Sequence, residues 1–258
     1  MPSLTLTPLK DMPFLRHGDN LADIVVGALS ANDIALNDND ILVLAQKIVS
    51  KAEGRSVHLA TVTPSPAAIT LAAKTEKDPR LVELILRESR EVLRTRPGTI
   101  IVEHKLGFVC ANAGIDHSNV QAPPGEVGSE EWVLLLPVDP DRSAALIRQE
   151  IQSQTGRRLG VLIIDSHGRA WRNGTVGAAI GIAGMPGLQD LRGEPDLFGF
   201  QLRITQIGAA DELAAAASLV MGQAAEGTPV VHARGFPYPL REGSLRELLR
   251  PREQDLFR

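Results

Sequence analysis

The sequence contains only one cysteine, Cys110, among its 258 residues. A single cysteine cannot form an intramolecular disulfide or a zinc site built from several thiolates, so the composition fits a reducing cytoplasm. No histidine pairs with Cys110 in an obvious motif. We therefore expect Cys110 to be a small buried residue rather than a nucleophile.

Aromatic residues are also scarce, at 3%, whereas hydrophobic residues together reach 43%. The core must therefore be built from Ala, Val, Leu and Ile, in a proportion typical of globular proteins. A net charge of −4 argues against a general nucleic-acid-binding protein, which would be basic. The chain also lacks the apolar run of about 18 residues that crosses a membrane, and residues 1–20 show no signal-peptide pattern. We predict a cytoplasmic protein with no nucleic-acid partner and no membrane partner.

Hydrophobic periodicity, caps and turn residues predict alternating helices and strands. The predicted helices cover residues 21–31, a segment from 66, a segment from 79 whose apolar face includes Val92, 141–155 and 211–223. The predicted strands cover residues 41–45, 99–103, 132–136, 159–164, 174–184, 202–207 and 230–233. Such alternation predicts an α/β or mixed α+β fold. Residues 117–131 have little pattern and are predicted to form a loop, either at a domain boundary or over a site.

One candidate site is the run of small and polar residues 111–119, which follows an apolar segment. Its short side chains allow the backbone to approach a ligand. Asp116 offers a hard oxygen ligand for magnesium or manganese, and Asn119 can hydrogen-bond a nucleotide. An Asx-type turn, in which these residues cap their own backbone, is the alternative that spacing alone favours.

A second candidate is Asp165-Ser166, predicted at the end of the apolar strand 159–164. Ligand sites in α/β sheets favour the carboxyl ends of strands, and an acid beside a hydroxyl resembles the magnesium-holding pairs of nucleotide enzymes. Arg169 and Arg172 follow and could bind phosphate or carboxylate oxygens. A turn cap with two solvated arginines explains the same residues equally well.

Two further segments have weaker signals. Residues 46–51 place two lysines after a predicted strand, where they could neutralise phosphate, although surface lysines are the simpler interpretation. Residues 221–227 end the alanine-rich helix, where Gly222 and Gly227 are typical of a helix stop. Gln223 or Glu226 could instead face a metal.

Together, several long runs resemble the coenzyme F420-0:L-glutamate ligase family in sequence and in order. The runs that carry the resemblance are residues 46–55, 77–86, 107–119, 164–172, 190–193, 210–214 and 220–223. They span most of residues 10–236, and several runs in a fixed order are more specific than any single motif.

The resemblance implies a GTP-dependent enzyme. GTP would phosphorylate a carboxylate of coenzyme F420-0, and the amine of L-glutamate would displace phosphate from the acyl phosphate to form an amide. Magnesium or manganese would be required, and a monovalent cation such as K⁺ would assist. The implied fold is a two-lobed mixed α/β fold in an intertwined homodimer. We expect one ligase domain over residues 1–258 and no additional flavin-binding domain.

The resemblance also assigns roles to residues. Asp116, Asp165 and Lys51 would be catalytic, and the metal ligands would be Asp116, Asp165, Ser166 and Gln223. GTP would contact Met12, Pro13, Phe14, Leu15, Gln46, Lys51, Asn119, Met221, Gly222, Gln223, Ala224, Ala225, Glu226, Gly227 and Thr228.

Three positions depart from the family pattern. Ser166 stands where threonine is commoner, which preserves the hydroxyl, and Gln46 stands where a hydroxyl residue is common. Phe200 stands where an arginine is usual, which removes a cation from the region expected to recognise the acceptor. The departure at Phe200 leaves open a ligase of the same mechanism acting on another carboxylate. A non-catalytic nucleotide-binding protein is the alternative from another functional class.

Overall fold

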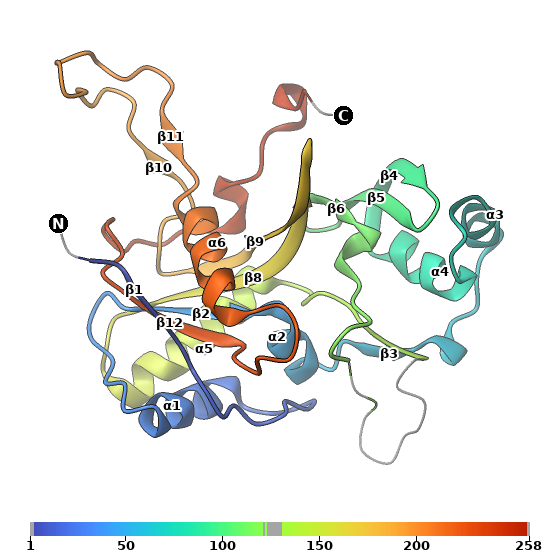
Figure 1. Cartoon of the computed structure of the whole chain (residues 1–258), viewed down its shortest axis with the longest axis horizontal. Coiled ribbons are helices and arrows are strands. Elements are labelled where there is room, and N and C mark those ends of the chain that lie inside the picture. The colour runs from blue at the N-terminus through green and yellow to red at the C-terminus, as the bar shows by residue number, and fades with distance from the viewer. Residues whose placement is uncertain (1–2, 121, 123–130, 257–258) are drawn as a thin grey trace.

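The computed structural model describes residues 3–120, 122 and 131–256. Its centre is a five-stranded sheet in the order β1-β12-β2-β8-β9 (Figure 1). These strands are β1 (Thr5–Pro8), β2 (Ile41–Ala45), β8 (Gly160–Arg169), β9 (Arg172–Ala183) and β12 (Val230–Arg234). β2 and β8 pair in parallel, and the other neighbours pair antiparallel.

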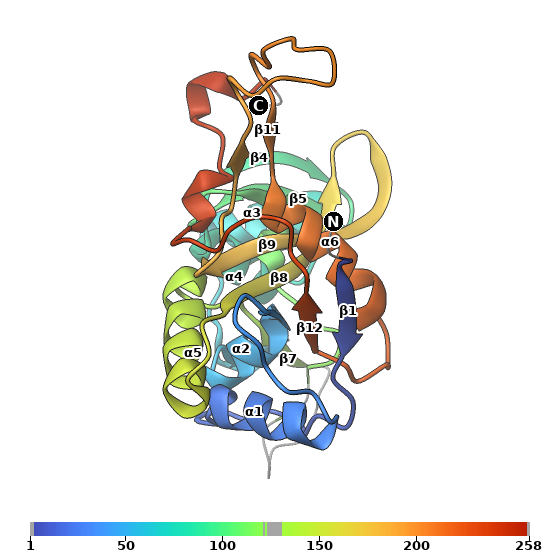
Figure 2. The same cartoon turned by 90° about the vertical axis from the view of Figure 1, so that its left-hand side faces the viewer.

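Helices cover both faces of this sheet (Figure 2). α1 (Leu21–Ala31) and α5 (Pro140–Thr155) pack on one face, and α6 (Ala209–Met221) packs on the other. The continuous apolar run in β8 explains this arrangement because neighbouring side chains in a strand point to opposite faces. Val161 and Ile163 accordingly enter the core under α1 and α5, while Leu162 and Ile164 enter the core under α6.

A second group of elements has its own hydrophobic core. α3 (Pro66–Thr75) and α4 (Pro79–Arg87) pack against the sheet β4 (Ser89–Arg96), β5 (Thr99–His104) and β6 (Val109–Ala111). β3 (Ser56–His58) pairs with β7 (Trp132–Leu134) beside them. Two short 3₁₀ turns, Leu59–Thr61 and Asn112–Gly114, complete the group.

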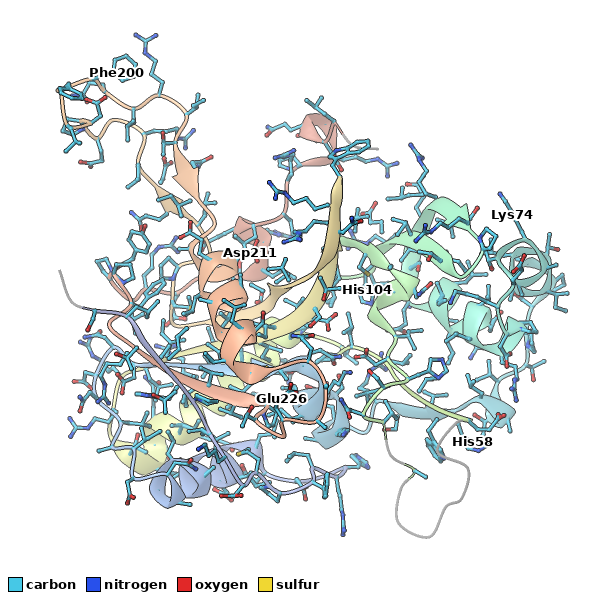
Figure 3. All side chains as sticks on the ribbon, in the orientation of Figure 1. His58, Lys74, His104, Phe200, Asp211 and Glu226 are labelled. Atoms are coloured by element: carbon cyan, nitrogen blue, oxygen red, sulfur yellow. The ribbon has the colours of Figure 1, made fainter. Side chains whose placement is uncertain are left out.

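Three further segments leave the central sheet. α2 (Gln46–Ala52) follows β2 directly and carries the chain toward the second core. β10 (Gln189–Asp190) and β11 (Gln206–Ile207) form the base of a projecting arm that carries Phe200 (Figure 3). The C-terminal segment contains the turns Leu245–Glu247 and Arg252–Gln254.

Most of the predicted elements are confirmed. The strand at 41–45 and the helix at 21–31 match their predicted bounds, and the remaining helices start within two residues of prediction. Local capping explains this accuracy. The side chain of Asn20 accepts from two backbone amides of α1, and Ser65 caps α3 just before a proline in its first turn.

Four predictions were wrong, because pairing between strands and tertiary contacts override the local pattern. Val92 lies in β4, since α4 ends at Arg87 and the chain then pairs with β5. Most of the predicted strand 202–207 belongs to the arm, and only Gln206–Ile207 is in a ladder. The predicted strand 132–136 ends at Leu134. Separately from these corrections, residues 46–51, to which the sequence analysis assigns no element, lie in the helix α2.

The fourth correction affects the candidate site. β8 was expected to end at Ile164 but continues to Arg169, because β9 pairs with it along its whole length. Asp165 and Ser166 therefore lie inside the strand, opposite Ala178 and Gly177.

Most of the predicted loop 117–131 lies outside the described residues. Within the described residues, no helix is long and apolar enough to cross a membrane.

A buried ionic cluster ties the ends of the central strands together. Asp40 is 1% exposed and accepts hydrogen bonds from Arg234 Nε at 2.9 Å, and its Oδ2 lies 2.8 Å from His232 Nε2. Burial by itself would raise the pKa of Asp40, but the hydrogen bonds from Arg234, the Asn37 backbone and His232 together lower it. The folded state therefore favours ionised Asp40.

We expect Asp40→Ala to destabilise the protein by about 3–5 kcal/mol near neutral pH, because it leaves buried partners without their counter-charge. Because the pKa of Asp40 is lower in the folded protein than in the unfolded chain, its ionised carboxylate stabilises the fold at pH values above the unfolded pKa of about 3.9. This stabilisation is lost as the pH falls through the folded pKa. The difference between parent and variant in urea unfolding should therefore shrink at acid pH. If Asp40→Ala lowers the free energy of unfolding no more than the exposed-surface control Glu150→Ala does, this role of Asp40 is contradicted.

Candidate functional site

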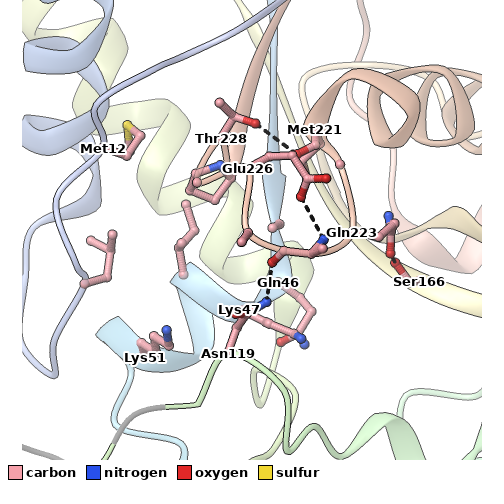
Figure 4. Close-up of a pocket in the computed structure, with 18 of the residues that line it drawn as sticks. Met12, Gln46, Lys47, Lys51, Asn119, Ser166, Met221, Gln223, Glu226 and Thr228 are labelled. Carbon is pink, nitrogen blue, oxygen red and sulfur yellow. Dashed lines mark hydrogen bonds between the residues drawn. The ribbon is translucent and has the colours of Figure 1, made fainter.

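A cavity of about 670 Å³ lies where β2 leaves the central sheet (Figure 4). The last residue of β2, Ala45, pairs with Ile164 of β8, and α2 starts at the next residue. β8 continues past this point, so Asp165 and Ser166 line the cavity from the strand that remains. The position is the carboxyl end of β2, where its parallel pairing with β8 stops, and α/β sheets commonly bind ligands at the carboxyl ends of their strands.

The cavity is lined by residues from five separate segments of the sequence. Figure 4 shows α2 with Lys51 on one side and Ser166 with Gln223 on the other. Most of the residues that the sequence assigned to the site line this single cavity, namely Met12, Pro13, Phe14, Leu15, Gln46, Lys51, Asn119, Asp165, Ser166, Met221, Gly222, Gln223, Ala224, Ala225, Glu226, Gly227 and Thr228.

Asp116 is the predicted site residue that does not line the cavity, but it contacts two residues that do. Gln46 Nε2 donates to Asp116 Oδ2 at 2.6 Å, and Lys47 Nζ lies 3.3 Å from Asp116 Oδ1. The backbone of Asp116 is fixed as well, since its N–H and C=O both hydrogen-bond Leu134. The alternative of an Asx turn does not describe this arrangement, because both carboxylate oxygens face residues of α2.

The electrostatics around Asp116 favour a bound cation. Burial raises the pKa of Asp116 to about 6, Lys47 opposes this rise, and repulsion from Asp165 adds to it. A carboxylate that is hard to ionise becomes a good ligand once a divalent ion supplies the missing positive charge. Asp165 also has His167 Nε2 at 3.1 Å from its Oδ2.

On the opposite wall, Ser166 and Gln223 are in direct contact. Ser166 Oγ donates to Gln223 Oε1 at 2.7 Å (Figure 4). With Asp116 and Asp165 they offer two carboxylates, a hydroxyl and an amide carbonyl, all hard oxygen donors of the kind that Mg²⁺ and Mn²⁺ take. No group of three or more His, Cys, Asp or Glu side chains suited to a metal occurs among the described residues. Protein ligands of this set would leave coordination positions for a ligand such as phosphate.

Lys47 and Lys51 give the cavity its positive charge. They lie one turn apart on α2 and both line the cavity. Burial lowers the pKa of Lys51, and the nearby charge of Lys47 lowers it further. Two cations held close together on one wall are stabilised by an anion between them, as a phosphate would provide.

The loop after α6 is braced by its own contacts. Gly222 has a φ of +77°, and a Cβ atom there would come within 2.3 Å of Glu226 Cδ, so the turn requires glycine. Glu226 accepts from the backbone of Ala224 at 2.7 Å, and Asn119 Nδ2 donates to the Ala224 carbonyl at 3.0 Å. Asn119 thus connects its own segment to the loop.

Two residues that were not predicted to belong to the site, Lys47 and Cys110, differ in how well the sequence predicts their role. Lys47 was not among the predicted site residues, although its place in the run 46–51 was the available signal. Cys110 is 7% exposed, and burial raises the pKa of its thiol to about 12, which confirms a small buried residue.

Comparison with known proteins identifies relatives along nearly the whole chain. The model of the family described as F420-0:Gamma-glutamyl ligase matches residues 10–235. A coenzyme F420:L-glutamate ligase of Methanothermobacter thermautotrophicus is 48% identical over 257 residues, 99% of each chain. The enzyme of the same name from Methanopyrus kandleri is 45% identical over 262 residues, 100% of this chain and 99% of the relative. That from Methanocaldococcus jannaschii is 43% identical over 250 residues, 96% of this chain and 94% of the relative.

The raised pKa of Asp116, about 6, makes a prediction for the metal-free protein. In the unfolded chain this carboxyl titrates near 3.9. Between these values the folded protein retains a proton that the unfolded chain has lost, so stability falls as pH rises through this window and stays lower above it. Thermal unfolding in a chelator should show Asp116→Asn to be more stable than the parent at about pH 8, with the gain vanishing near pH 4. A variant less stable than the parent at the higher pH would contradict the burial of an uncompensated charge.

Proposed function

Because the chain belongs to the F420-0:gamma-glutamyl ligase family, we propose that it is a coenzyme F420:L-glutamate ligase that joins L-glutamate to the deazaflavin coenzyme F420-0. The observation that carries this proposal is the match to relatives named for this activity along almost the full length of the chain. The cavity described above supports it with the groups that phosphoryl transfer requires.

The reaction has two steps. A carboxylate oxygen of coenzyme F420-0 attacks the γ-phosphorus of GTP, GDP leaves, and an acyl phosphate is formed. The amine nitrogen of L-glutamate then attacks the acyl carbon, the bond to the phosphate oxygen breaks, and the amine loses a proton. Activation is needed because a free carboxylate has no adequate leaving group.

GTP is proposed to occupy the cavity of about 670 Å³. Lys51 neutralises its phosphates, with Lys47 beside it on the same wall. The base and sugar lie among residues 12–15, Asn119 and residues 221–228. Transfer of the terminal phosphoryl group depends mostly on positioning and charge neutralisation, and these residues supply both.

A magnesium or manganese ion is proposed to be held by Asp116, Asp165, Ser166 and Gln223. Their oxygen donors fit a hard cation, and the repulsion between the two carboxylates is relieved by one. When bound, the ion would neutralise negative charge on the phosphate oxygens. K⁺ as an assisting monovalent ion remains a prediction, which replacing potassium with choline in the assay would test.

The acceptor is proposed to lie along the hairpin of β8 and β9. Arg169 and Arg172 stand beyond Ser166 on that hairpin, and Arg172 is exposed. Their guanidinium groups suit carboxylate or phosphate oxygens. In the arm with Phe200, the guanidinium carbon of Arg203 lies 5.6 Å from the Phe200 ring centre.

A two-lobed subunit within a homodimer is proposed as the assembly. Separate hydrophobic cores under the central sheet and under α3 and α4 support the division into lobes. The arm supports the dimer, because it exposes Leu197 at 97%, Phe198 at 95% and Ile204 at 88%. Exposed apolar side chains gathered on one segment commonly mark an interface.

One assay tests the function. The protein, GTP, Mn²⁺, L-glutamate and coenzyme F420-0 are incubated, and both GDP and the mass of the coenzyme are followed. We expect glutamate-dependent GDP and a coenzyme heavier by one glutamyl residue.

Asp165→Asn should lower the rate of this reaction at least about 100-fold, because it removes charge that organises the transferring phosphoryl group. Lys51→Met should weaken GTP binding by about 1.5–3 kcal/mol.

The exposed-surface variant Glu150→Gln serves as the control for this assay and should behave like the parent. GTP binding without glutamate-dependent GDP would favour a non-catalytic nucleotide-binding protein. GDP formation with an acceptor other than coenzyme F420-0, and none with it, would reassign the substrate.

The dimer can be tested separately by sedimentation. The parent should sediment as a dimer at micromolar concentration, and a double variant, Leu197→Ser with Phe198→Ser, should shift toward monomer. Leu219→Ser changes a similarly exposed residue on α6, 84% exposed, and should leave the assembly intact. A stable monomeric parent would reject the proposal.

A further inference from the structure

Gln46 is the first residue of α2, and its side chain is almost completely buried, at 1% exposure. A buried amide is costly unless its donor and acceptor atoms find partners. Its partners therefore indicate why a polar side chain is kept inside the protein at this position.

Both ends of the Gln46 amide have a partner within the protein. Nε2 donates to Asp116 Oδ2 at 2.6 Å, and Oε1 accepts from Ser50 Oγ at 2.9 Å. Ser50 is fully buried one helical turn later, so the two side chains lie on the same face of α2. The reverse amide orientation would place Oε1 against a carboxylate, which has no hydrogen to donate when ionised. The contact thus fixes which end of the amide meets Asp116.

The other groups around Asp116 make this contact consequential. Lys47 Nζ lies 3.3 Å from Oδ1 and also donates to the carbonyl and the hydroxyl of Ser118, each at 3.0 Å. The Asp116 backbone is held by Leu134. With the backbone fixed and each carboxylate oxygen facing a separate donor, rotation of the carboxylate plane would break at least one of these contacts.

We propose that Gln46 is a positioning residue, whose amide, oriented by Ser50, holds the carboxylate of Asp116 in the plane in which it faces the metal-binding part of the cavity. This inference rests on the proposed role of Asp116 as a metal ligand. Gln46 acts on the reaction through Asp116, rather than through a direct contact with GTP. Removing a hydrogen-bond partner that orients a metal ligand commonly lowers metal affinity or activity about 10- to 100-fold.

The decisive variant is Gln46→Met, which keeps an unbranched side chain of similar length and removes both hydrogen bonds. Ser50→Ala leaves the amide in place but removes the donor that orients it. A matched control is Gln154→Met, because Gln154 Nε2 also donates to an aspartate, Asp23 Oδ1, at 2.6 Å, on the exposed surface of the protein.

Three quantities are measured for each variant: Mn²⁺ affinity without nucleotide, GTP affinity, and kcat and KM for GTP at saturating Mn²⁺. We expect Gln46→Met to lower Mn²⁺ affinity and kcat about 10- to 100-fold while KM for GTP is unchanged. Ser50→Ala should show a smaller loss in the same direction, and Gln154→Met should match the parent.

Parent-like Mn²⁺ affinity in Gln46→Met together with weaker GTP binding would overturn the proposal and make Gln46 a nucleotide contact. Parent-like values throughout would reduce Gln46 to a packing residue. If Gln46→Met does not fold, Ser50→Ala decides by the same measurements. A parent that binds no Mn²⁺ overturns the metal site and this role together, whereas a parent that binds Mn²⁺ beside an unaffected Gln46→Met overturns this role alone.

Discussion

The site depends on two carboxylates, Asp116 and Asp165, held close enough in a buried setting to repel each other. Burial and this repulsion raise the pKa of Asp116 to about 6. In water the two charges would be screened, but in the interior the charge of Asp165 disfavours ionisation of Asp116. A positive charge is therefore required nearby, and Lys47 supplies part of it at 3.3 Å. The proposed divalent ion supplies the rest.

The fold holds these groups together across long stretches of sequence. β2 ends at Ala45, and α2 turns away from the sheet at once, which leaves a gap beside β8. Asp165 and Ser166 face that gap from β8, and Gln223 closes it from the loop after α6. Asp116 arrives from the second core and docks on Gln46, 70 residues away in the chain. The cavity is thus the place where the central sheet, α2 and the second core meet.

Features governed by local chemistry were predictable from the sequence. Caps such as Asn20 and Ser65, and the apolar run of β2, define their elements through neighbouring residues alone. The extension of β8 through polar residues to Arg169 was not predictable in this way, because pairing with β9 maintains it. The gathering of Asp116, Asp165 and Lys51 came from the family resemblance, since residue type alone favoured a turn cap for Asp116 and a surface lysine for Lys51, and left Asp165 open between a turn cap and a ligand. The contact of Lys47 with Asp116 depends on tertiary approach, which no local pattern records.

The central claim is that both aspartates hold one divalent ion that also contacts the phosphates of GTP. Electron–nuclear double resonance of Mn²⁺ tests it directly, with aspartate carboxyl groups labelled with ¹³C and a GTP analogue that cannot transfer its terminal phosphate. The account predicts couplings to ³¹P and to carboxyl ¹³C in the same ion, with the carbon coupling reduced in Asp116→Asn and in Asp165→Asn. Mn²⁺ that couples to phosphorus but to no aspartate carbon would contradict the account.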